Sequence, residues 1–148
     1  MSFRENGEKK TVSIVVPVYN EHLNIEKFYE EVTGAMETTD YKYEIIFVDD
    51  GSGDATPLVL SRLTRQDDRV RALILARNFG HQLAITCGME HARGDAVITM
   101  DGDLQHPPAM LPDLIRKWRE GYDVVQTIRL STDDAGLMKT LTSKMYYS

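Results

Sequence analysis

Short runs of apolar residues alternate along this chain with segments in which apolar residues recur every three or four positions. The runs are rich in β-branched residues and stop at polar or turn-forming residues, which predicts strands, whereas the periodic segments predict amphipathic helices. Strands that alternate with helices over short connections are typical of an α/β fold, a mostly parallel sheet with helices on both faces. The predicted strands are residues 11–18, 44–48, 70–75, 97–100 and 124–128.

The predicted helices carry recognisable end signals. Asn24 is the predicted N-cap of the first helix, and Thr56 is that of the second, with Pro57 in the first helical position. Gly121 is expected to end a further helix that begins near Leu111. Between residues 77 and 93 a stripe of small residues predicts a helix that lies very close to its neighbour. The stripe consists of Gly80, Ala84, Gly88 and Ala92.

The run at residues 97–100 ends in two carboxylates, Asp101 and Asp103, on either side of Gly102. We predict that this run is a buried strand covered on both faces of the sheet. Because residues two apart in an extended chain point to the same side, the two carboxylates can share one divalent cation. Gly102 allows the backbone to turn or to approach a ligand closely.

Polar residues also follow the first and second predicted strands. In a parallel α/β sheet, ligands bind outside the carboxyl ends of the strands, so these residues are expected to converge. Carboxylates gathered there would raise one another's pKa unless a cation compensates, and oxygen ligands without a matching Cys/His set favour Mg²⁺ or Mn²⁺ over Zn²⁺. Because such ions also bind phosphates, a nucleotide is the expected ligand. The converging residues are Tyr19, Asn20, Glu21, Asp49, Asp50, Asp101, Asp103 and Gln105.

The expected nucleoside contacts come from the first two strand ends. Either Asp49 or Asp50 could accept hydrogen bonds from a base or ribose, and Tyr19 offers an aromatic face beside them. Arg77 and Arg129 are candidates for contacting a diphosphate, although either could pair with one of the many acids. The histidines are less informative: solvated or capping roles are expected for His22, His81 and His91, and a rigid turn with two prolines for His106.

Length and composition limit the possible functions. A chain of 148 residues favours one domain, and 17 basic against 23 acidic residues without a block of like charge argue against nucleic-acid binding. The single Cys87 cannot form an internal disulfide and is expected to be a small buried residue in a reducing compartment. Residues 1–10 are polar and expected to be flexible, and no run of 18 apolar residues occurs, which predicts a cytoplasmic location.

Five segments, in order and spacing, resemble family 2 glycosyltransferases of the GT-A fold. The closest resemblance is to the polyprenyl-phosphate branch, which includes dolichol-phosphate mannose synthase and the bactoprenol glucosyltransferases. It covers residues 12–147 and implies that the chain is the Rossmann-like, nucleotide-binding half of a GT-A fold. The segments are residues 17–21 (PVYNE), 48–56 (VDDGSGDAT), 77–88 (RNFGHQLAITCG), 94–108 (GDAVITMDGDLQHPP) and 121–125 (GYDVV) with Arg129.

The resemblance implies roles for individual residues. Asp101 and Asp103 would hold the metal and diphosphate and be the catalytic pair, with Gly102 and Gln105 beside them and Arg129 engaging the diphosphate. The residues implied around the base and ribose are Pro17, Tyr19, Glu21 and Asp50, with Asp49 adjacent and not distinguishable by sequence. The chain departs from the family at Thr132, where similar proteins often carry a second Arg, whereas Lys139 matches a basic position.

The implied reaction is an inverting transfer from a nucleotide-sugar donor to a polyprenyl phosphate at the cytoplasmic face of a membrane. An acceptor phosphate is already ionised at neutral pH and needs little help from a base, whereas a saccharide hydroxyl, the main alternative acceptor, would require one. Nucleotidyl transfer and a receiver-like Mg²⁺-binding signalling domain are further alternatives. They fit less well, because the first expects a glycine-rich basic loop and the second an acid pair after its first strand.

The last residues of the sequence keep a helical spacing and carry no end signal. Leu137, Leu141, Met145 and Tyr146 recur at intervals of about four, which predicts a helix that continues to the end of the sequence. We therefore expect a truncated domain whose acceptor-binding half lies beyond residue 148. An exposed sheet edge and an apolar helix face would then favour a homo-oligomer.

Overall fold

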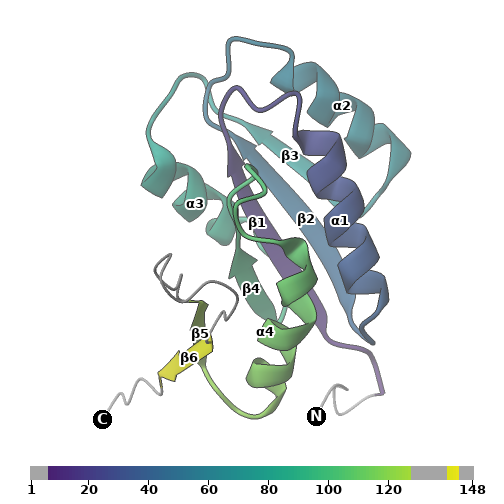
Figure 1. Ribbon diagram of the computed structural model, residues 1–148. Helices are drawn as coiled ribbons and strands as arrows, with labels where there is room; N and C mark the ends of the chain where they lie inside the picture. Colours follow the sequence, from purple (N-terminus) through teal and green to yellow (C-terminus); the bar gives the residue numbers. More distant parts are fainter. Residues whose placement is uncertain (1–6, 128–139, 144–148) are drawn as a thin grey trace.

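The computed structural model of the chain describes residues 7–127 and 140–143. Four parallel strands form one sheet in the order β3-β2-β1-β4, and helices lie on both of its faces (Figure 1). The predicted α/β fold is therefore confirmed. The elements are β1 (Thr11–Val18), α1 (Ile25–Glu37), β2 (Lys42–Asp49), α2 (Thr56–Gln66), β3 (Val70–Ile74), α3 (His81–Glu90), β4 (Ala96–Thr99), the 3₁₀ helix η1 (Pro108–Met110), α4 (Leu111–Arg119), β5 (Val124–Thr127) and β6 (Thr140–Ser143).

The sheet divides the hydrophobic core into a large and a small part. On one face, α1, α2 and α4 pack against β1 and β2 around Phe28 and Phe47, whose rings meet edge to face at 6.1 Å. Each large apolar side chain buried in this way contributes about 1.5–3 kcal/mol relative to its exposed state. On the other face, α3 covers Val15, Ile46 and Val48. The two central strands are apolar on both faces, and this packing fixes the position of the loops at their carboxyl ends.

The close packing of α3 on the sheet depends on Gly88. A side chain at this position would overlap Val15 and crowd Val48, so only glycine lets the helix lie this close. The predicted start of this helix, before Gly80, is wrong. α3 begins at His81, and Gly80 precedes it with φ +101° and open space around it. Residues 77–80 form a loop, which lies beside the carboxyl ends of the strands.

The N-cap predictions are only partly correct. Asn24 is the N-cap of α1, but its side chain donates to Glu21 Oε2 and makes no capping hydrogen bond. The prediction for Thr56 is wrong, because Ala55 is the N-cap of α2 and Thr56 is its first helical residue. The Thr56 Oγ1 atom accepts a hydrogen bond from the Glu21 backbone N–H at 3.0 Å. This threonine therefore joins two loops and does not cap its own helix.

β4 lies at the edge of the four-stranded sheet, and the burial of its side chains shows that the prediction of a strand covered on both faces is wrong. Its side chains alternate in burial, and Val97 is 39% exposed. An apolar run alone cannot distinguish a central strand from an edge strand, because the covering elements are distant in sequence.

β5 does not join the parallel sheet in the part of the chain that the structure describes. It pairs antiparallel with β6, residues 124–127 opposite residues 143–140. Leu141 therefore lies in a strand, and the helix predicted through it is wrong, since pairing with a neighbouring strand outweighs local spacing. The other residues of that predicted helix, Leu137, Met145 and Tyr146, lie outside the described ranges. Residues 1–6, which were expected to be flexible, also lie outside them.

Candidate functional site

The loops that follow β1, β2, β3 and β4 meet at the carboxyl ends of the strands and border a cavity of about 360 Å³. The sequence predicts this convergence for β1, β2 and β4, and the structure brings those loops together. The predicted site residues that line the cavity are Pro17, Tyr19, Glu21, Asp50, Asp101, Gly102 and Asp103. The loop after β3 adds residues that the sequence analysis did not select: Asn78, Gly80 and His81.

Hydrogen bonds join the loop after β1 to the loop after β2. The Asn20 backbone N–H donates to Ser52 Oγ at 2.8 Å, and Asn20 Oδ1 accepts from the Gly53 N–H at 2.9 Å. Asn20 has φ +50°, a left-handed conformation that asparagine tolerates better than most residues. These contacts place the half-exposed ring of Tyr19 and the carboxylate of Glu21 at the wall of the cavity.

The base of the loop after β2 is held by Asp54. Its carboxylate accepts hydrogen bonds from the Thr56 N–H at 2.9 Å and from His22 Nδ1 at 2.6 Å. Desolvation alone would raise the pKa of Asp54, but the hydrogen bonds from Thr56 and His22 outweigh it and hold that pKa well below its usual range. Asp54 is therefore ionised at neutral pH and stabilises the loop in this shape.

The structure separates the roles of Asp49 and Asp50, which the sequence could not. Asp49 is fully buried, and its Oδ1 accepts a hydrogen bond from the Ser52 N–H at 2.9 Å. Asp50 lines the cavity, and its two oxygens accept from the N–H groups of Phe79 at 2.7 Å and Gly80 at 3.1 Å. Asp49 thus shapes its own loop, whereas Asp50 fixes the loop after β3 and keeps its remaining lone pairs beside the cavity.

Gly51 makes the contact between these two loops possible. It has φ +76°, and a side chain there would overlap the backbone of Arg77 and Asn78. The backbones of the β2 and β3 loops therefore touch at a point that only glycine permits.

The acidic turn after β4 is pressed against the end of β1. A side chain at Gly102 would lie 2.9 Å from Val18 Cγ1 and 3.4 Å from Val16 Cγ1, which explains the glycine between the two aspartates. Leu104 has φ +64°, a costly conformation for a leucine, and packs against the core beneath the turn. The turn is thus anchored by apolar contacts, while its carboxylates border the cavity.

Among the predicted site residues that the structure describes, Asn20, Asp49, Arg77 and Gln105 do not line the cavity. Gln105 is exposed, and its backbone N–H donates to Asp103 Oδ1 at 3.1 Å, so it contributes to the shape of the turn. Arg129 lies outside the described residues, as do Thr132 and Lys139. Arg77 lies over the ring of Phe79, with its guanidinium carbon 4.3 Å from the ring centre.

In the described part of the chain, the carboxylates of the acidic turn have no Lys or Arg partner. Among residues 7–127 and 140–143, no Lys or Arg nitrogen lies within 4 Å of Asp101 or Asp103 in an ion pair. The same ranges contain no group of three or more His, Cys, Asp and Glu side chains arranged to hold a metal. Two open carboxylates fit a hard divalent cation that takes its other ligands from phosphates and water, which is how Mg²⁺ is commonly bound.

His81 is the functional candidate that sequence reasoning missed. It lines the cavity, and its Nε2 lies 2.8 Å from Asp101 Oδ1. The predicted third strand could have indicated this residue, because the loop that follows a parallel strand starts at the same edge of the sheet as the other site loops. The helix predicted from residue 77 onward placed His81 on a helix surface instead.

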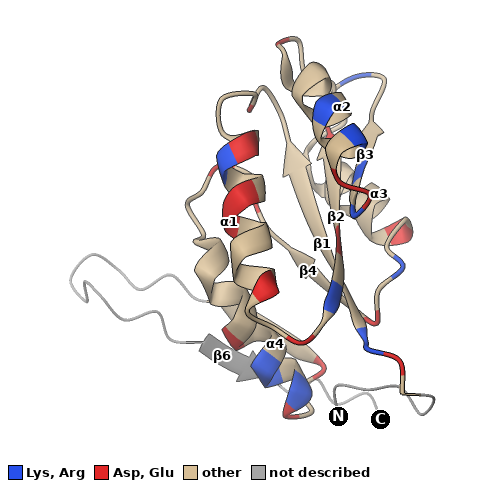
Figure 2. Ribbon diagram, turned by 90° about the vertical axis from the view of Figure 1, so that its right-hand side faces the viewer, with Lys and Arg blue, Asp and Glu red and all other residues tan. Residues whose placement is uncertain are grey.

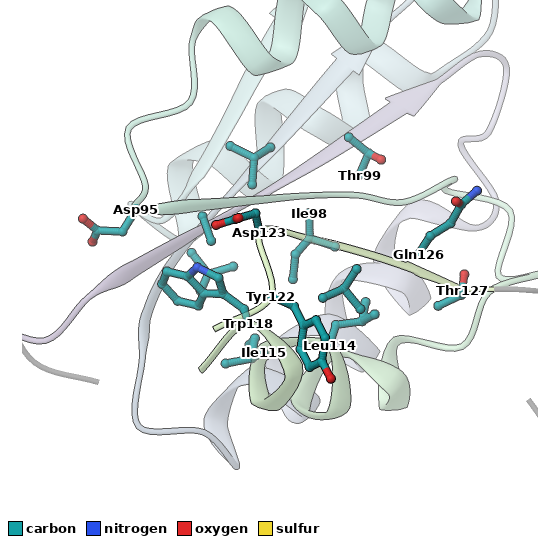
Figure 3. A pocket seen from close by; sticks show the side chains of 14 residues that line it. Asp95, Ile98, Thr99, Leu114, Ile115, Trp118, Tyr122, Asp123, Gln126 and Thr127 are labelled. Carbon is teal, nitrogen blue, oxygen red and sulfur yellow. The ribbon is translucent and has the colours of Figure 1, made fainter. Parts of the chain in front are cut away.

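A larger cavity, of about 450 Å³, lies between β4, α4 and β5 (Figure 3). Figure 3 shows Asp123 near the Asp95 end of β4, and Gln126 and Thr127 near its Thr99 end. The two acids therefore lie toward the amino end of β4, away from the Asp101–Asp103 turn. This cavity follows the open edge of the sheet and does not gather the predicted site residues.

Charged side chains of both signs occur on helices of the fold. Figure 2 shows Asp and Glu mainly on α1 and basic residues on α2 and α4, without a continuous basic face in that view. No helix in the described part of the chain has both the length and the apolar character needed to span a membrane.

Comparison with known proteins supports the predicted family. The chain is 44% identical over 135 residues to the uncharacterized glycosyltransferase YkcC of Bacillus subtilis, covering 91% of this chain and 42% of that protein. It is 42% identical over 136 residues to the bactoprenol glucosyl transferase of Shigella phage SfV, covering 92% and 44%. It is 44% identical over 127 residues to the undecaprenyl-phosphate 4-deoxy-4-formamido-L-arabinose transferase of Pseudomonas syringae, covering 85% and 38%. The chain thus spans less than half the length of these relatives.

Solved structures share the fold. A mannosyltransferase from Pyrobaculum calidifontis in complex with GDP-Man and Mn²⁺ superposes with a TM-score of 0.70 at 22% identity, over 86% of this chain and 37% of that one. A glucosyl-3-phosphoglycerate synthase from Mycobacterium tuberculosis in complex with Mn²⁺ and UDP gives a TM-score of 0.59 at 24% identity, over 74% and 39%. The sequence pattern of glycosyl transferase family 2 matches residues 13–147, and the chain belongs to that family.

Proposed function

We propose that this chain is the donor-binding domain of a metal-dependent glycosyltransferase that moves a sugar from a nucleotide-sugar to a polyprenyl phosphate. The observation that carries the proposal is the convergence of Tyr19, Asp50, Asp101 and Asp103 on one cavity at the carboxyl ends of the strands. Family membership argues against the nucleotidyltransferase and receiver-domain alternatives.

The nucleoside is bound on the side of the cavity formed by β1 and β2. Tyr19 offers its ring to the base, and Asp50 accepts hydrogen bonds from the base or ribose while it holds the loop at residues 79–80. Pro17 and Glu21 complete the wall. Asp49 is assigned a supporting role because it is fully buried and bonded within its own loop.

The diphosphate is bound on the side formed by the acidic turn. Asp101 and Asp103 would hold Mg²⁺ or Mn²⁺, which would supply positive charge beside the diphosphate. Gly102 keeps the turn against β1, so that both carboxylates stay at the cavity. Gln105 and Arg129 remain predicted contributors to this side.

The acceptor is proposed from chemistry and from the relatives. Two of them are named as transferases for bactoprenol and undecaprenyl phosphate. A phosphate oxygen is ionised at neutral pH, so the nucleophile needs no general base from the chain. Because the acceptor is lipid-linked, the full protein would work at a membrane surface.

The experiment is calorimetric titration of the chain with UDP, GDP and their sugar conjugates, with and without Mn²⁺. We expect one nucleoside diphosphate to bind, and to bind more tightly with Mn²⁺. The Asp103→Asn variant should lose the Mn²⁺-dependent part of the affinity, by about 100-fold or more, and keep its fold. Equal Mn²⁺-dependent affinity in the parent and the variant would contradict the assignment of the metal site.

A further inference from the structure

His81 lies in the donor cavity, but the proposed function gives it no role. We propose that His81 is a positioning residue that holds the carboxylate of Asp101 in the orientation required by the metal and diphosphate. This inference rests on the proposed function, because it takes Asp101 to be a metal ligand.

The hydrogen bond between the two side chains has only one possible direction. Nε2 of His81 lies 2.8 Å from Oδ1 of Asp101, and an ionised carboxylate only accepts hydrogen bonds, so the imidazole donates. This contact occupies one carboxylate oxygen and leaves the other for a cation. Within the described ranges, no other segment of the chain forms a hydrogen bond with the Asp101 side chain.

The two carboxylates of the turn are held in different ways. Asp103 accepts a hydrogen bond from the backbone N–H of Gln105 in the same turn, so the turn itself orients it. Asp101 depends on a side chain that lies 20 residues earlier in the sequence. Because the Asp101 side chain is 44% exposed, packing alone does not fix its rotamer, and the imidazole supplies the missing constraint.

The backbone position of His81 is well defined, although its side chain is 55% exposed. His81 is the first residue of α3, which Gly88 holds against β1, and it follows the loop whose Phe79 and Gly80 N–H groups are bound by Asp50. The proposed nucleoside residue Asp50 is thus connected to Asp101 through residues 79–81. A partner that orients a metal ligand typically accounts for 10–100-fold in metal affinity, whereas an exposed ion pair without such a role contributes little.

The test compares His81→Ala with His91→Ala, a control just beyond the other end of α3, where the His91 side chain hydrogen-bonds to Cys87 O. Mn²⁺ affinity is measured by electron paramagnetic resonance with saturating UDP or GDP, whichever the parent chain binds. Affinity for the same nucleotide without metal is measured by calorimetry. We expect His81→Ala to weaken Mn²⁺ binding about tenfold and leave metal-free nucleotide affinity unchanged, with no change in either for His91→Ala.

A conservative variant separates positioning from a structural role. Glutamine can also donate a hydrogen bond from its side chain, so His81→Gln should recover part of the Mn²⁺ affinity, and it serves as the test if His81→Ala does not fold. Parent-like Mn²⁺ affinity in folded His81→Ala, or in His81→Gln where His81→Ala does not fold, would overturn this inference alone. An equal loss of metal-free nucleotide affinity in the variant would also overturn it. If the parent chain shows no Mn²⁺-dependent binding, the proposed function and this inference are both wrong.

Discussion

The amino and carboxyl ends of the parallel sheet both gather acidic side chains, but they neutralise them differently. At the amino end, Glu44 accepts hydrogen bonds from Ser13 Oγ at 2.7 Å and from the Arg93 N–H at 2.8 Å. Its second oxygen accepts from Arg71 at 3.1 Å, and Arg71 also donates to His91 O. Glu44 therefore joins β1, β2 and β3 and has a basic partner.

At the carboxyl end, the acids that border the cavity have no Lys or Arg partner in the described part of the chain. Asp50 is bound by two backbone N–H groups, Asp103 by one, and Asp101 by His81, with no Lys or Arg ion pair to them in the described part of the chain. Like charges held together without compensation destabilise a fold, and proteins keep such arrangements where function requires them. The acids at the amino end hold the sheet together, whereas those at the carboxyl end are available to a ligand.

The largest expected effect breaks the loop contact on which the carboxyl end is built. In Gly51→Ala, the new methyl group overlaps the backbone of Arg77 and Asn78 at a positive φ, and the expected loss of unfolding free energy is on the order of 3 kcal/mol. Urea denaturation measures it. Gly53→Ala is the matched control in the same loop, because its side chain would meet nothing within 4 Å and its φ is ordinary. Similar losses in both variants would show that the contact with residues 77–78 is unimportant.

The sequence predicts this end of the sheet well because its signals are local. Apolar runs followed at once by Asp50 or by Asp101 identify strand ends, and the parallel topology brings those ends together. The three loops selected in this way all line the cavity. The family is also predicted correctly, since several ordered motifs carry it.

The remaining features depend on contacts between distant residues. The edge position of β4 is decided by which strand lies beside it, and the pairing of β5 with β6 by residues 13 or more positions away. The bond from His81 to Asp101 requires the start of α3 to be known to the residue, and end signals do not give that accuracy. The difference between Asp49 and Asp50 depends on which of two adjacent side chains reaches the cavity and the N–H groups of residues 79–80.

The next effect concerns the amino end and depends on pH. Burial alone would raise the pKa of Glu44, but hydrogen bonds from Ser13, Arg93 and Arg71 outweigh it and lower that pKa. Because the folded pKa lies below the unfolded value of about 4.3, the stabilisation is present above that pH and is lost as the pH falls below it. We expect Glu44 to contribute to the unfolding free energy that is lost between pH 5 and pH 2.

Denaturation of Glu44→Gln across this pH range isolates that contribution. The variant should be less stable than the parent at pH 7 and should approach it at pH 2. Hydrogen bonds from Arg69 also lower the pKa of Asp67, so the parent loses stability in acid for more than one reason, and the difference between parent and variant is the informative quantity. Glu90→Gln, on the exposed side of α3, is the control. A constant difference between Glu44→Gln and the parent at all pH values would contradict the prediction.

A comparable effect on binding distinguishes the two adjacent aspartates of the nucleoside side. Asn at position 50 keeps one acceptor but turns an NH₂ group toward one of the two N–H donors, so Asp50→Asn should weaken metal-free nucleoside diphosphate binding about tenfold, or about 1.4 kcal/mol. Asp49→Asn keeps the acceptor for the Ser52 N–H and should leave this affinity unchanged. Calorimetry in the presence of EDTA measures both, and the reverse order would exchange the assigned roles.

The smallest effect has the opposite sign and tests the comparison of the two ends most directly. Asn at position 103 can still accept the hydrogen bond from the Gln105 N–H, so Asp103→Asn removes a charge without removing the contact that shapes the turn. Without metal, the variant loses a like charge beside Asp101, and its unfolding free energy should rise by a few tenths of a kcal/mol, a gain that 0.5 M salt should screen. Glu44→Gln at the same pH should lose stability, because it removes a charge that Arg71 balances. If Asp103→Asn in EDTA were as destabilised as Glu44→Gln, the acid at position 103 would be a structural residue like Glu44, and the two ends of the sheet would not differ in the way proposed.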